Sequence, residues 1–251
     1  MSEISATTKI AVVTGANKGV GFAIAQGLAD AGATVFVGSR DRHRGEEAVD
    51  ALISARPAGA IDVRLLEIDV TDDESVVAAA KQVAQSVPRV DVLVNNAGLA
   101  HGFTTLPSVE TLDGIKQIYE VNVFGAIRVT QAFLPLVRTA PAGSIVMVSS
   151  MTGSLTAALD PEGQFYRVNS LGYNSSKSAL NAAVIAFAKE LSDSNIRVNA
   201  VEPGFVSTDM NANRGVLSPA DGAAPAIRVA LDDSDDRPTA SFFGADGPHP
   251  W

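Results

Sequence analysis

The 251-residue sequence contains no cysteine, which excludes disulfide bonds, thiolate catalysis and cysteine-ligated zinc. This absence fits a reducing cytoplasm, where we expect the protein to reside. The three histidines, His43, His101 and His249, lie far apart and lack the paired spacing of a metal site, so we expect no metal. No stretch approaches the ~18 apolar residues that span a bilayer, and the opening MSEISATTK has no basic segment followed by an apolar one. We therefore expect neither a membrane span nor a secretory signal.

Basic residues are also scarce, since 19 Lys and Arg stand against 28 Asp and Glu and the net charge is −9. Proteins that bind nucleic acid concentrate Lys and Arg, so we do not expect a nucleic-acid partner. Four aspartates gather near the C-terminus: Asp232, Asp233, Asp235 and Asp236. They could be read as a metal site, but we favour an exposed turn because like charges repel one another.

What the sequence does contain is a regular alternation of strand-like and helix-like segments. Runs rich in Val, Ile and Leu span residues 9–15, 33–39, 63–70, 90–98, 144–150, 196–204 and 240–244. Apolar residues at helical spacing mark 20–32, 41–56, 71–87, 112–137, the region of Tyr173 and 218–231. Near-continuous apolar strands are typical of a parallel sheet covered by helices on both faces. We therefore predict a single α/β domain over residues 1–251 (core about 9–243, tail 244–251), a doubly wound Rossmann-type fold with a parallel sheet of seven strands.

In such sheets, ligands bind beyond the carboxyl ends of the strands. The first strand runs at that end into the loop TGANKGVG, residues 14–21. A glycine-rich turn that opens a helix offers free backbone N–H groups and a positive dipole end to a diphosphate. The G-x-x-x-G-x-G spacing is neither the common dinucleotide fingerprint nor a P-loop. By itself the loop is a weak signal, and the less favoured alternative is a helix start that merely tolerates glycine.

The end of the second strand-like segment, Gly38-Ser39-Arg40, bears on which dinucleotide binds. NAD-preferring enzymes place Asp or Glu here to hold the ribose 2′-hydroxyl, whereas this sequence has Arg40, and Lys18 would face the same region. A charge pair about 5 Å apart is worth ~3 kcal/mol at an effective dielectric near 20. Two cations therefore predict NADP(H). Alternatively, Arg40 is a surface residue in a run of arginines.

Tyr173 and Lys177 lie four residues apart in SLGYNSSKSALN, and Tyr173 is the only one of the three tyrosines with a cation at that spacing. Residues i and i+4 share a helix face, and a cation ~4–6 Å away lowers the pKa of an acid by one to three units. Bringing a phenol from its usual pKa near 10 to neutrality takes ~4 kcal/mol. The pair therefore predicts a tyrosine that transfers a proton, although taken alone it could be an exposed helix contact.

These motifs, together with NNAG at 95–98, Asn122, Ser150 and Pro203-Gly204, resemble the short-chain dehydrogenase/reductase family over residues 9–243. Within the family, the TGANKG loop, the SRD after the second strand and the lengthened segment before Tyr173 are similar to NADPH-dependent carbonyl reductases. The resemblance implies a catalytic tetrad of Asn122, Ser150, Tyr173 and Lys177. It also implies an NADP(H) site that is shared by Tyr173 and Lys177 and otherwise consists of Gly15, Asn17, Lys18, Gly19, Val20, Gly21, Arg40, Asp69, Val70, Asn96, Ala97, Gly98, Pro203, Gly204, Val206 and Thr208.

The resemblance assigns roles within these sets. The three glycines of the loop would hold the diphosphate, with Asn17, Lys18 and Arg40 around the ribose and its phosphate. Residues 69–70 would contact the adenine, the backbone of residues 96–98 would line the cofactor site, and the loop after Pro203 would cover the nicotinamide. Ser150 would hold the substrate carbonyl toward Tyr173. Asn122 lies in an otherwise apolar helical stretch, where an unpartnered buried amide costs ~1–3 kcal/mol, and the family gives it a water-linked proton relay to Lys177.

The implied reaction is the reversible, NADPH-dependent reduction of ketones and aldehydes to alcohols, with hydride from the nicotinamide and a proton from Tyr173. One alternative is a 3-oxoacyl-carrier-protein reductase, which would need a basic patch for its acidic carrier and is disfavoured by the net charge of −9. The other is a non-catalytic NADP(H) sensor, which is disfavoured because Tyr173 and Lys177 are both present.

The segment between Ser150 and Tyr173 is longer than the family norm, and we expect it to line the substrate pocket with Phe165 and Tyr166. Residues 206–217 are the only candidate lid, which predicts a pocket open to bulky ketones. The expected partner is therefore a small-molecule carbonyl compound. The helical stretches 112–137 and 173–191 are the expected interface of a homodimer or homotetramer, although carbonyl reductases with this extra segment can also be monomers.

Overall fold

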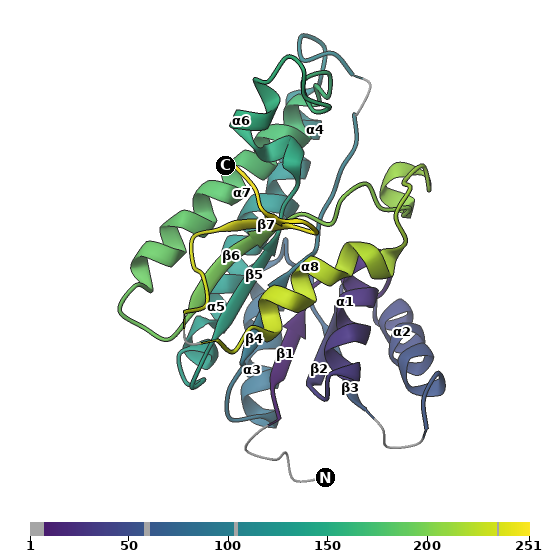
Figure 1. Cartoon of the computed structure of the whole chain (residues 1–251). Coiled ribbons are helices and arrows are strands. Elements are labelled where there is room, and N and C mark those ends of the chain that lie inside the picture. The colour runs from purple at the N-terminus through teal and green to yellow at the C-terminus, as the bar shows by residue number, and fades with distance from the viewer. Residues whose placement is uncertain (1–7, 58–60, 103–104, 235) are drawn as a thin grey trace.

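A computed structural model describes residues 8–57, 61–102, 105–234 and 236–251, so Asp235 of the acidic run lies outside the described residues. The strands are β1 (Ile10–Val13), β2 (Thr34–Ser39), β3 (Asp62–Glu67), β4 (Val92–Asn95), β5 (Ser144–Val148), β6 (Arg197–Val201), β7 (Phe242–Gly244) and β8 (Gly247–Pro248). They form one sheet in the order β3-β2-β1-β4-β5-β6-β7-β8, which runs through the molecule between two layers of helices (Figure 1).

The first seven strands pair in parallel, and only β8 is antiparallel to its neighbour, β7. Every residue of β1, β2, β4 and β5 is buried, as expected for strands covered on both faces. The predicted doubly wound α/β fold is confirmed. The short hairpin of β7 and β8 was not predicted, because a two-residue strand leaves no periodic pattern in the sequence.

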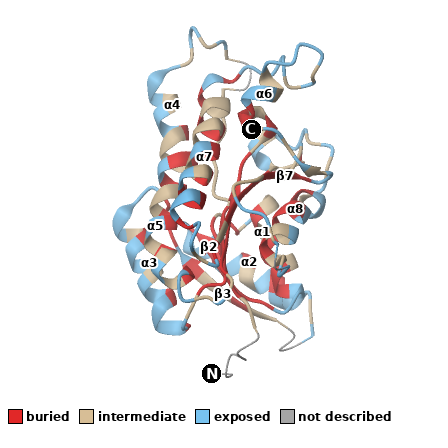
Figure 2. Cartoon of the chain, turned by 60° about the vertical axis from the view of Figure 1, so that its left-hand side comes forward, coloured by how far each residue is buried: buried red, intermediate tan, exposed pale blue. Residues whose placement is uncertain are grey.

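The helices divide between the two faces of the sheet. One face is covered by α1 (Gly19–Asp30), α2 (Arg42–Ser54) and α8 (Pro219–Leu231). The other is covered by α3 (Asp73–Ser86), α5 (Ala126–Val137) and α7 (Leu171–Glu190), with α4 (Leu112–Tyr119) packed against α7. Figure 2 shows the buried sheet between these layers. Among the described residues, no helix is long and apolar enough to cross a membrane, and no group of three His, Cys, Asp or Glu could hold a metal.

The apolar stretch at 112–137 is not one regular helix. Between α4 and α5, residues Glu120–Gly125 form a π-helical turn, η1. Such turns are rare and often mark functional sites. Gly125 permits this path, because a Cβ there would come within 2.9 Å of Val70 Cγ2. The turn carries Asn122, which is buried and faces the segment that follows β4.

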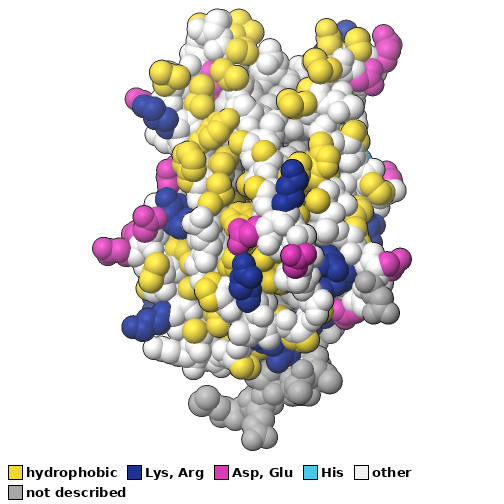
Figure 3. Space-filling model, turned by 90° about the vertical axis from the view of Figure 1, so that its left-hand side faces the viewer, with side chains coloured by type: hydrophobic (Ala, Val, Ile, Leu, Met, Phe, Trp, Pro, Cys, Tyr) yellow, Lys and Arg dark blue, Asp and Glu magenta, His cyan; other side chains and the backbone are white. Residues whose placement is uncertain are grey.

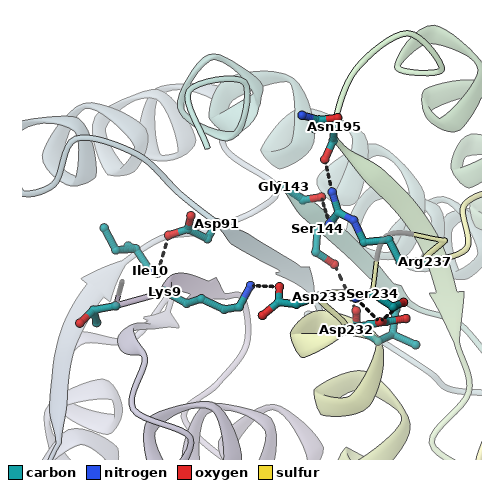
Figure 4. A network of polar contacts seen from close by, with 12 residues as sticks. Lys9, Ile10, Asp91, Gly143, Ser144, Asn195, Asp232, Asp233, Ser234 and Arg237 are labelled. Carbon is teal, nitrogen blue, oxygen red and sulfur yellow. Dashed lines mark hydrogen bonds and ion pairs between the residues drawn. The ribbon is translucent and has the colours of Figure 1, made fainter. Parts of the chain in front are cut away.

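The amino ends of the strands are joined by hydrogen bonds and ion pairs (Figure 4). The buried Asp91 accepts a hydrogen bond from Ile10 N at 2.8 Å and pairs with Arg89 at 2.8 Å. Lys9 Nζ lies 2.6 Å from Asp233 Oδ1, and Arg237 donates to the carbonyl of Gly143 at 3.2 Å. One aspartate of the acidic run is thus engaged in joining the C-terminal region to β1.

Candidate active site

The loop between β1 and α1 is shaped by glycines with left-handed backbone conformations. Gly15 has φ +60°, and a Cβ there would come within 2.9 Å of Ala97 Cα, so the loop can approach the segment after β4 only with glycine. Asn96 holds this contact, since its Nδ2 donates to the carbonyls of Thr14 at 2.9 Å and Gly15 at 3.0 Å. The sequence did not show that the amide of Asn96 would bind the loop itself.

The first turn of α1 has unused hydrogen-bond donors. Its N-cap is Lys18, and within the described chain no side chain caps it and no acidic residue lies in its first turn. By contrast, Asp72 caps α3, with two more acidic residues in that helix's first turn. An uncapped N-terminus presents free N–H groups and a partial positive charge. Of the predicted set, Gly19 and Val20 begin this helix and Gly21 follows within its first turn.

The cations predicted for the adenosine side already interact with carboxylates. Lys18 Nζ lies 2.7 Å from Asp209 Oδ2, and its hydrogen bond lowers the pKa of Asp209. Arg44, at the start of α2, also acts on the Asp209 charge, so it approaches the same place. Burial raises the pKa of Asp69, but hydrogen bonds from Thr71 outweigh it and lower the pKa, and the charges of Arg40 and Arg128 act in the same direction. No local pattern in the sequence singles out Arg44 from the neighbouring exposed charges.

The four residues of the implied tetrad converge at the carboxyl ends of β4 and β5. Ser150 hydrogen-bonds the phenol of Tyr173. Lys177 is buried, its Nζ donates to Val148 O at 2.8 Å, and it lies 5.7 Å from the centre of the Tyr173 ring.

Asn122 reaches the neighbour of Lys177 on α7. Its Nδ2 donates to Ser176 Oγ at 3.0 Å and to Leu99 O at 2.9 Å, while its Oδ1 accepts from Leu99 N at 2.7 Å. Ser149 is the other serine at the end of β5. Its hydroxyl donates a hydrogen bond to Asn181 Oδ1 at 2.6 Å, so Ser150 is the serine that hydrogen-bonds Tyr173. The closeness of α7 to the turn after β5 depends on Gly153, where a Cβ would meet Lys177 Cβ at 2.6 Å.

The loop after β6 covers the glycine loop. It contains Pro203 and Gly204, and the buried Val206 pairs with Leu217. Thr208 Cγ2 lies 3.4 Å from the Cβ position of Gly19, so this loop lies against the start of α1.

The long segment before Tyr173 forms a 3-10 turn, η2 (Met151–Gly153), and the short helix α6 (Leu155–Ala158). Phe165 packs partly against the core, whereas Tyr166 is 52% exposed. Both lie on the expected segment, but Tyr166 faces solvent.

Comparison with known proteins identifies this arrangement. Residues 9–216 match the short chain dehydrogenase family. The chain belongs to this family. The (+)-neomenthol dehydrogenase of Arabidopsis thaliana is 32% identical over 286 residues, covering 94% of this chain and 96% of the relative. A 3-oxoacyl-carrier-protein reductase of Aquifex aeolicus is 32% identical over 210 residues, covering 84% of this chain and 79% of the relative.

Among solved structures, the NADPH-bound carbonyl reductase from chicken fatty liver superposes with a TM-score of 0.84 at 26% identity, covering 97% of this chain and 99% of that one. The family resemblance stated from the motifs is therefore confirmed, and this chain is an oxidoreductase of the short-chain dehydrogenase family.

The pKa values in this short-chain dehydrogenase differ from the expectation drawn from sequence spacing. Burial raises the pKa of Tyr173 to about 12, and the Glu202 carboxylate adds to the rise, whereas the hydrogen bond with Ser150 opposes it. Burial lowers the pKa of Lys177 to about 8. The predicted fall in the pKa of Tyr173 is therefore not found, because burial of the phenol has a larger effect than the hydrogen bond with Ser150, the one interaction that lowers the pKa.

Proposed function

We propose that this short-chain dehydrogenase reduces ketones and aldehydes to alcohols with NADPH, reversibly. The observation that carries the proposal is the convergence of Ser150, Tyr173 and Lys177 at the carboxyl edge of the sheet, beside an uncapped helix N-terminus. This edge is where doubly wound folds bind ligands.

The residues around the glycine loop fit a dinucleotide. Uncapped amides at the start of α1 suit a diphosphate, and the close approach of Gly15 to Ala97 leaves a narrow backbone cradle for it. Lys18, Arg40 and Arg44 provide positive charge on the adenosine side, where a 2′-phosphate would lie. When bound, the nicotinamide supplies the hydride and, once oxidised, a positive ring charge.

The chain's own residues supply the proton and the orientation. Ser150 holds the substrate oxygen next to the Tyr173 hydroxyl, which gives its proton to that oxygen as the carbon is reduced. Because the phenol has a raised pKa of about 12, it is fully protonated at neutral pH and ready to act as the acid. The buried ammonium of Lys177 then stabilises the phenolate until a proton returns from solvent. Asn122 positions α7 through Ser176, and a water at this place would complete its relay to Lys177.

Bulky apolar ketones are the substrate class that the exposed apolar side chains of the loop after β6 favour. Three apolar side chains of the loop after β6 are exposed: Phe205, Met210 and Val216. Met210 Cε lies 3.7 Å from the Cβ position of Gly98, so it borders the site. The alignment with a neomenthol dehydrogenase over 94% of the chain supports the same class. A 3-oxoacyl-carrier-protein reductase is the second candidate, supported by 32% identity over a smaller share of the chain, 84%.

The face formed by α4, α5 and α7 is our candidate for self-association as a homodimer or homotetramer. Figure 3 shows hydrophobic side chains interleaved with charged ones on this side of the molecule. Leu112 and Phe124 are 72% and 51% exposed there. Sedimentation measurements would decide between these assemblies and a monomer.

The test is NADPH consumption by purified protein with a panel of cyclic ketones, aldehydes and 3-oxoacyl thioesters, with NADH assayed in parallel. We expect turnover of apolar ketones with NADPH. The Tyr173→Phe variant should lose about 10²–10⁴-fold in turnover while NADPH fluorescence still reports binding. Equal rates with both cofactors would contradict the proposal that Lys18, Arg40 and Arg44 lie around the 2′-phosphate. Unchanged turnover in Tyr173→Phe would contradict the proposed proton transfer.

A further inference from the structure

The side chain of Glu110 reaches from the segment before α4 (residues 105–111) to the first turn of α7. Both of its carboxylate oxygens accept from Gly172 N, Oε1 at 3.3 Å and Oε2 at 3.2 Å. Gly172 is the residue directly before Tyr173, the proposed proton donor. The contact therefore joins the chain beside the proposed catalytic tyrosine to a residue 62 positions away.

The start of α7 is not capped by its own residues. Within the described part of the chain, its N-cap, Ser170, makes no side-chain capping hydrogen bond, and no acidic residue lies in its first turn. By contrast, the neighbouring helix α4 is capped by Thr111, whose hydroxyl accepts from Gly114 N. The N–H groups at a helix start need acceptors and favour a negative charge. For α7, Glu110 supplies both an acceptor and the charge.

Two glycines leave the space that this carboxylate occupies. Glu110 Oε1 lies 2.7 Å from the Cβ position of Gly172 and 3.3 Å from that of Gly102. A methyl group at Gly172 would push the carboxylate away, and one at Gly102 would crowd it. The contact thus depends on glycine directly beside the proposed proton donor.

The next turn of α7 is held by other contacts. Asn122 Nδ2 donates to Ser176 Oγ at 3.0 Å, and Ser178 Oγ donates to Gly153 O at 2.9 Å. These bonds hold the helix about one turn beyond the proposed proton donor, whereas Glu110 holds it one residue before. The position of the phenol is therefore set from both sides along the helix.

We propose that Glu110 is a positioning residue: its carboxylate fixes the first turn of α7 and thereby the place of the Tyr173 hydroxyl relative to the substrate, an inference that rests on the proposed function. Glu110 itself neither donates nor accepts the transferred proton. Proton transfer needs the phenol within hydrogen-bond reach of the substrate oxygen, and a misplacement of about 1 Å can lower the rate ~10²-fold. Loss of the carboxylate should therefore slow the reaction while leaving the glycine loop, and with it NADPH binding, unchanged.

The test compares kcat for ketone reduction with the dissociation constant of NADPH. Glu110→Ala removes the acceptor and should lower kcat about tenfold, with NADPH affinity unchanged. Glu110→Gln keeps a side-chain oxygen for Gly172 N, so it should restore most of the loss. Asp113→Ala is the matched control, because it makes the same change in net charge at a side chain that is 89% exposed at the start of α4. Its kcat should equal that of the wild type.

A second readout does not depend on turnover. The amide proton of Gly172 should exchange with solvent about tenfold faster in Glu110→Ala than in the wild type, and at the wild-type rate in Asp113→Ala, as followed by NMR. If Glu110→Ala is too unstable to assay, Glu110→Asp takes its place, because the shorter side chain keeps the charge but draws the carboxylate away from Gly172 N. It should lower kcat in the same way.

A lower midpoint of unfolding in Glu110→Ala with wild-type kcat, measured where the variant is folded, would show that the contact only stabilises the helix and would overturn the inference. A Glu110→Gln variant as slow as Glu110→Ala would also overturn it. If Tyr173→Phe kept its turnover, the proposed function itself would be wrong. If Tyr173→Phe were inactive and Glu110→Ala fully active, only this inference would fail.

Discussion

The two ends of the sheet differ in whether their buried charged side chains form ion pairs. At the amino ends, the buried Asp91 is paired with Arg89. Figure 4 shows its hydrogen bond from Ile10 N and the pairing of Lys9 with Asp233. At the carboxyl ends, Lys177 is equally buried, yet among the described residues its ammonium donates to the Val148 carbonyl at 2.8 Å, faces the Tyr173 ring at 5.7 Å and has no carboxylate within ion-pair distance.

The difference separates the part of the molecule that stabilises the fold from the part that binds and reacts. Satisfied charges at the amino ends hold β1, β4 and the C-terminal region in register. Unsatisfied donors at the carboxyl ends, namely the Lys177 ammonium and the first turn of α1, can be satisfied by a ligand. Active sites commonly cost stability in this way, and the comparison can be tested by altering each end in turn.

The largest effect is expected from Lys177→Met. Turnover should fall about 10²-fold or more, yet the protein should become more stable. The pKa of Lys177 falls from 10.5 to about 8 on folding, which costs about 3 kcal/mol while both states are protonated. Because the unfolded chain then binds more protons between pH 8 and 10.5, wild-type stability rises through that window. Denaturant unfolding at pH 7 and pH 10 checks this, and an equal difference between variant and wild type at both pH values would contradict it.

The converse change at the amino ends is Asp91→Asn. It leaves Arg89 partly buried without its carboxylate, and breaking such a pair costs about 3–5 kcal/mol. We expect a lower midpoint of unfolding with unchanged KM for NADPH at temperatures where the variant is folded. A variant with normal stability but altered KM would remove the distinction between the two ends.

Gly15→Ala should weaken cofactor binding by about tenfold, because φ +60° and the 2.9 Å approach to Ala97 Cα both disfavour a side chain. Gly32→Ala is the matched control: it also has positive φ, at +87°, but no neighbour within 4 Å of its Cβ position among the described atoms. NADPH titration followed by fluorescence compares the two. Equal losses of affinity would show that backbone strain alone, and not the cradle, is responsible.

The smallest effect is expected from Asp209→Asn, which releases Lys18 from an exposed ion pair. We expect NADPH affinity to rise about threefold with NADH affinity unchanged, since only NADPH presents a 2′-phosphate. The measurement is the ratio of the two dissociation constants at low and high salt. A rise that is the same for both cofactors would place Lys18 away from the 2′-phosphate.

Much of this arrangement could be predicted locally. Near-continuous runs of Val, Ile and Leu predicted the strands, and the spacing of Tyr173 and Lys177 placed them on one helix face. The π-helical turn at Asn122 could not be predicted, because the apolar spacing of residues 112–137 also fits an uninterrupted α-helix. The Lys18–Asp209 pair joins residues 191 positions apart, and the strand β8 depends on pairing with β7.

Sequence alone determined the alternation of strands and helices, the glycine loop and the identity of the residues that carry chemistry, because these follow from side-chain type and short-range spacing. Tertiary structure decided their electrostatic state. Burial raises the pKa of Tyr173 and lowers that of Lys177, and packing of distant segments places Lys18 against Asp209. Desolvation and through-space charge depend on which segments pack together, and no local spacing encodes that.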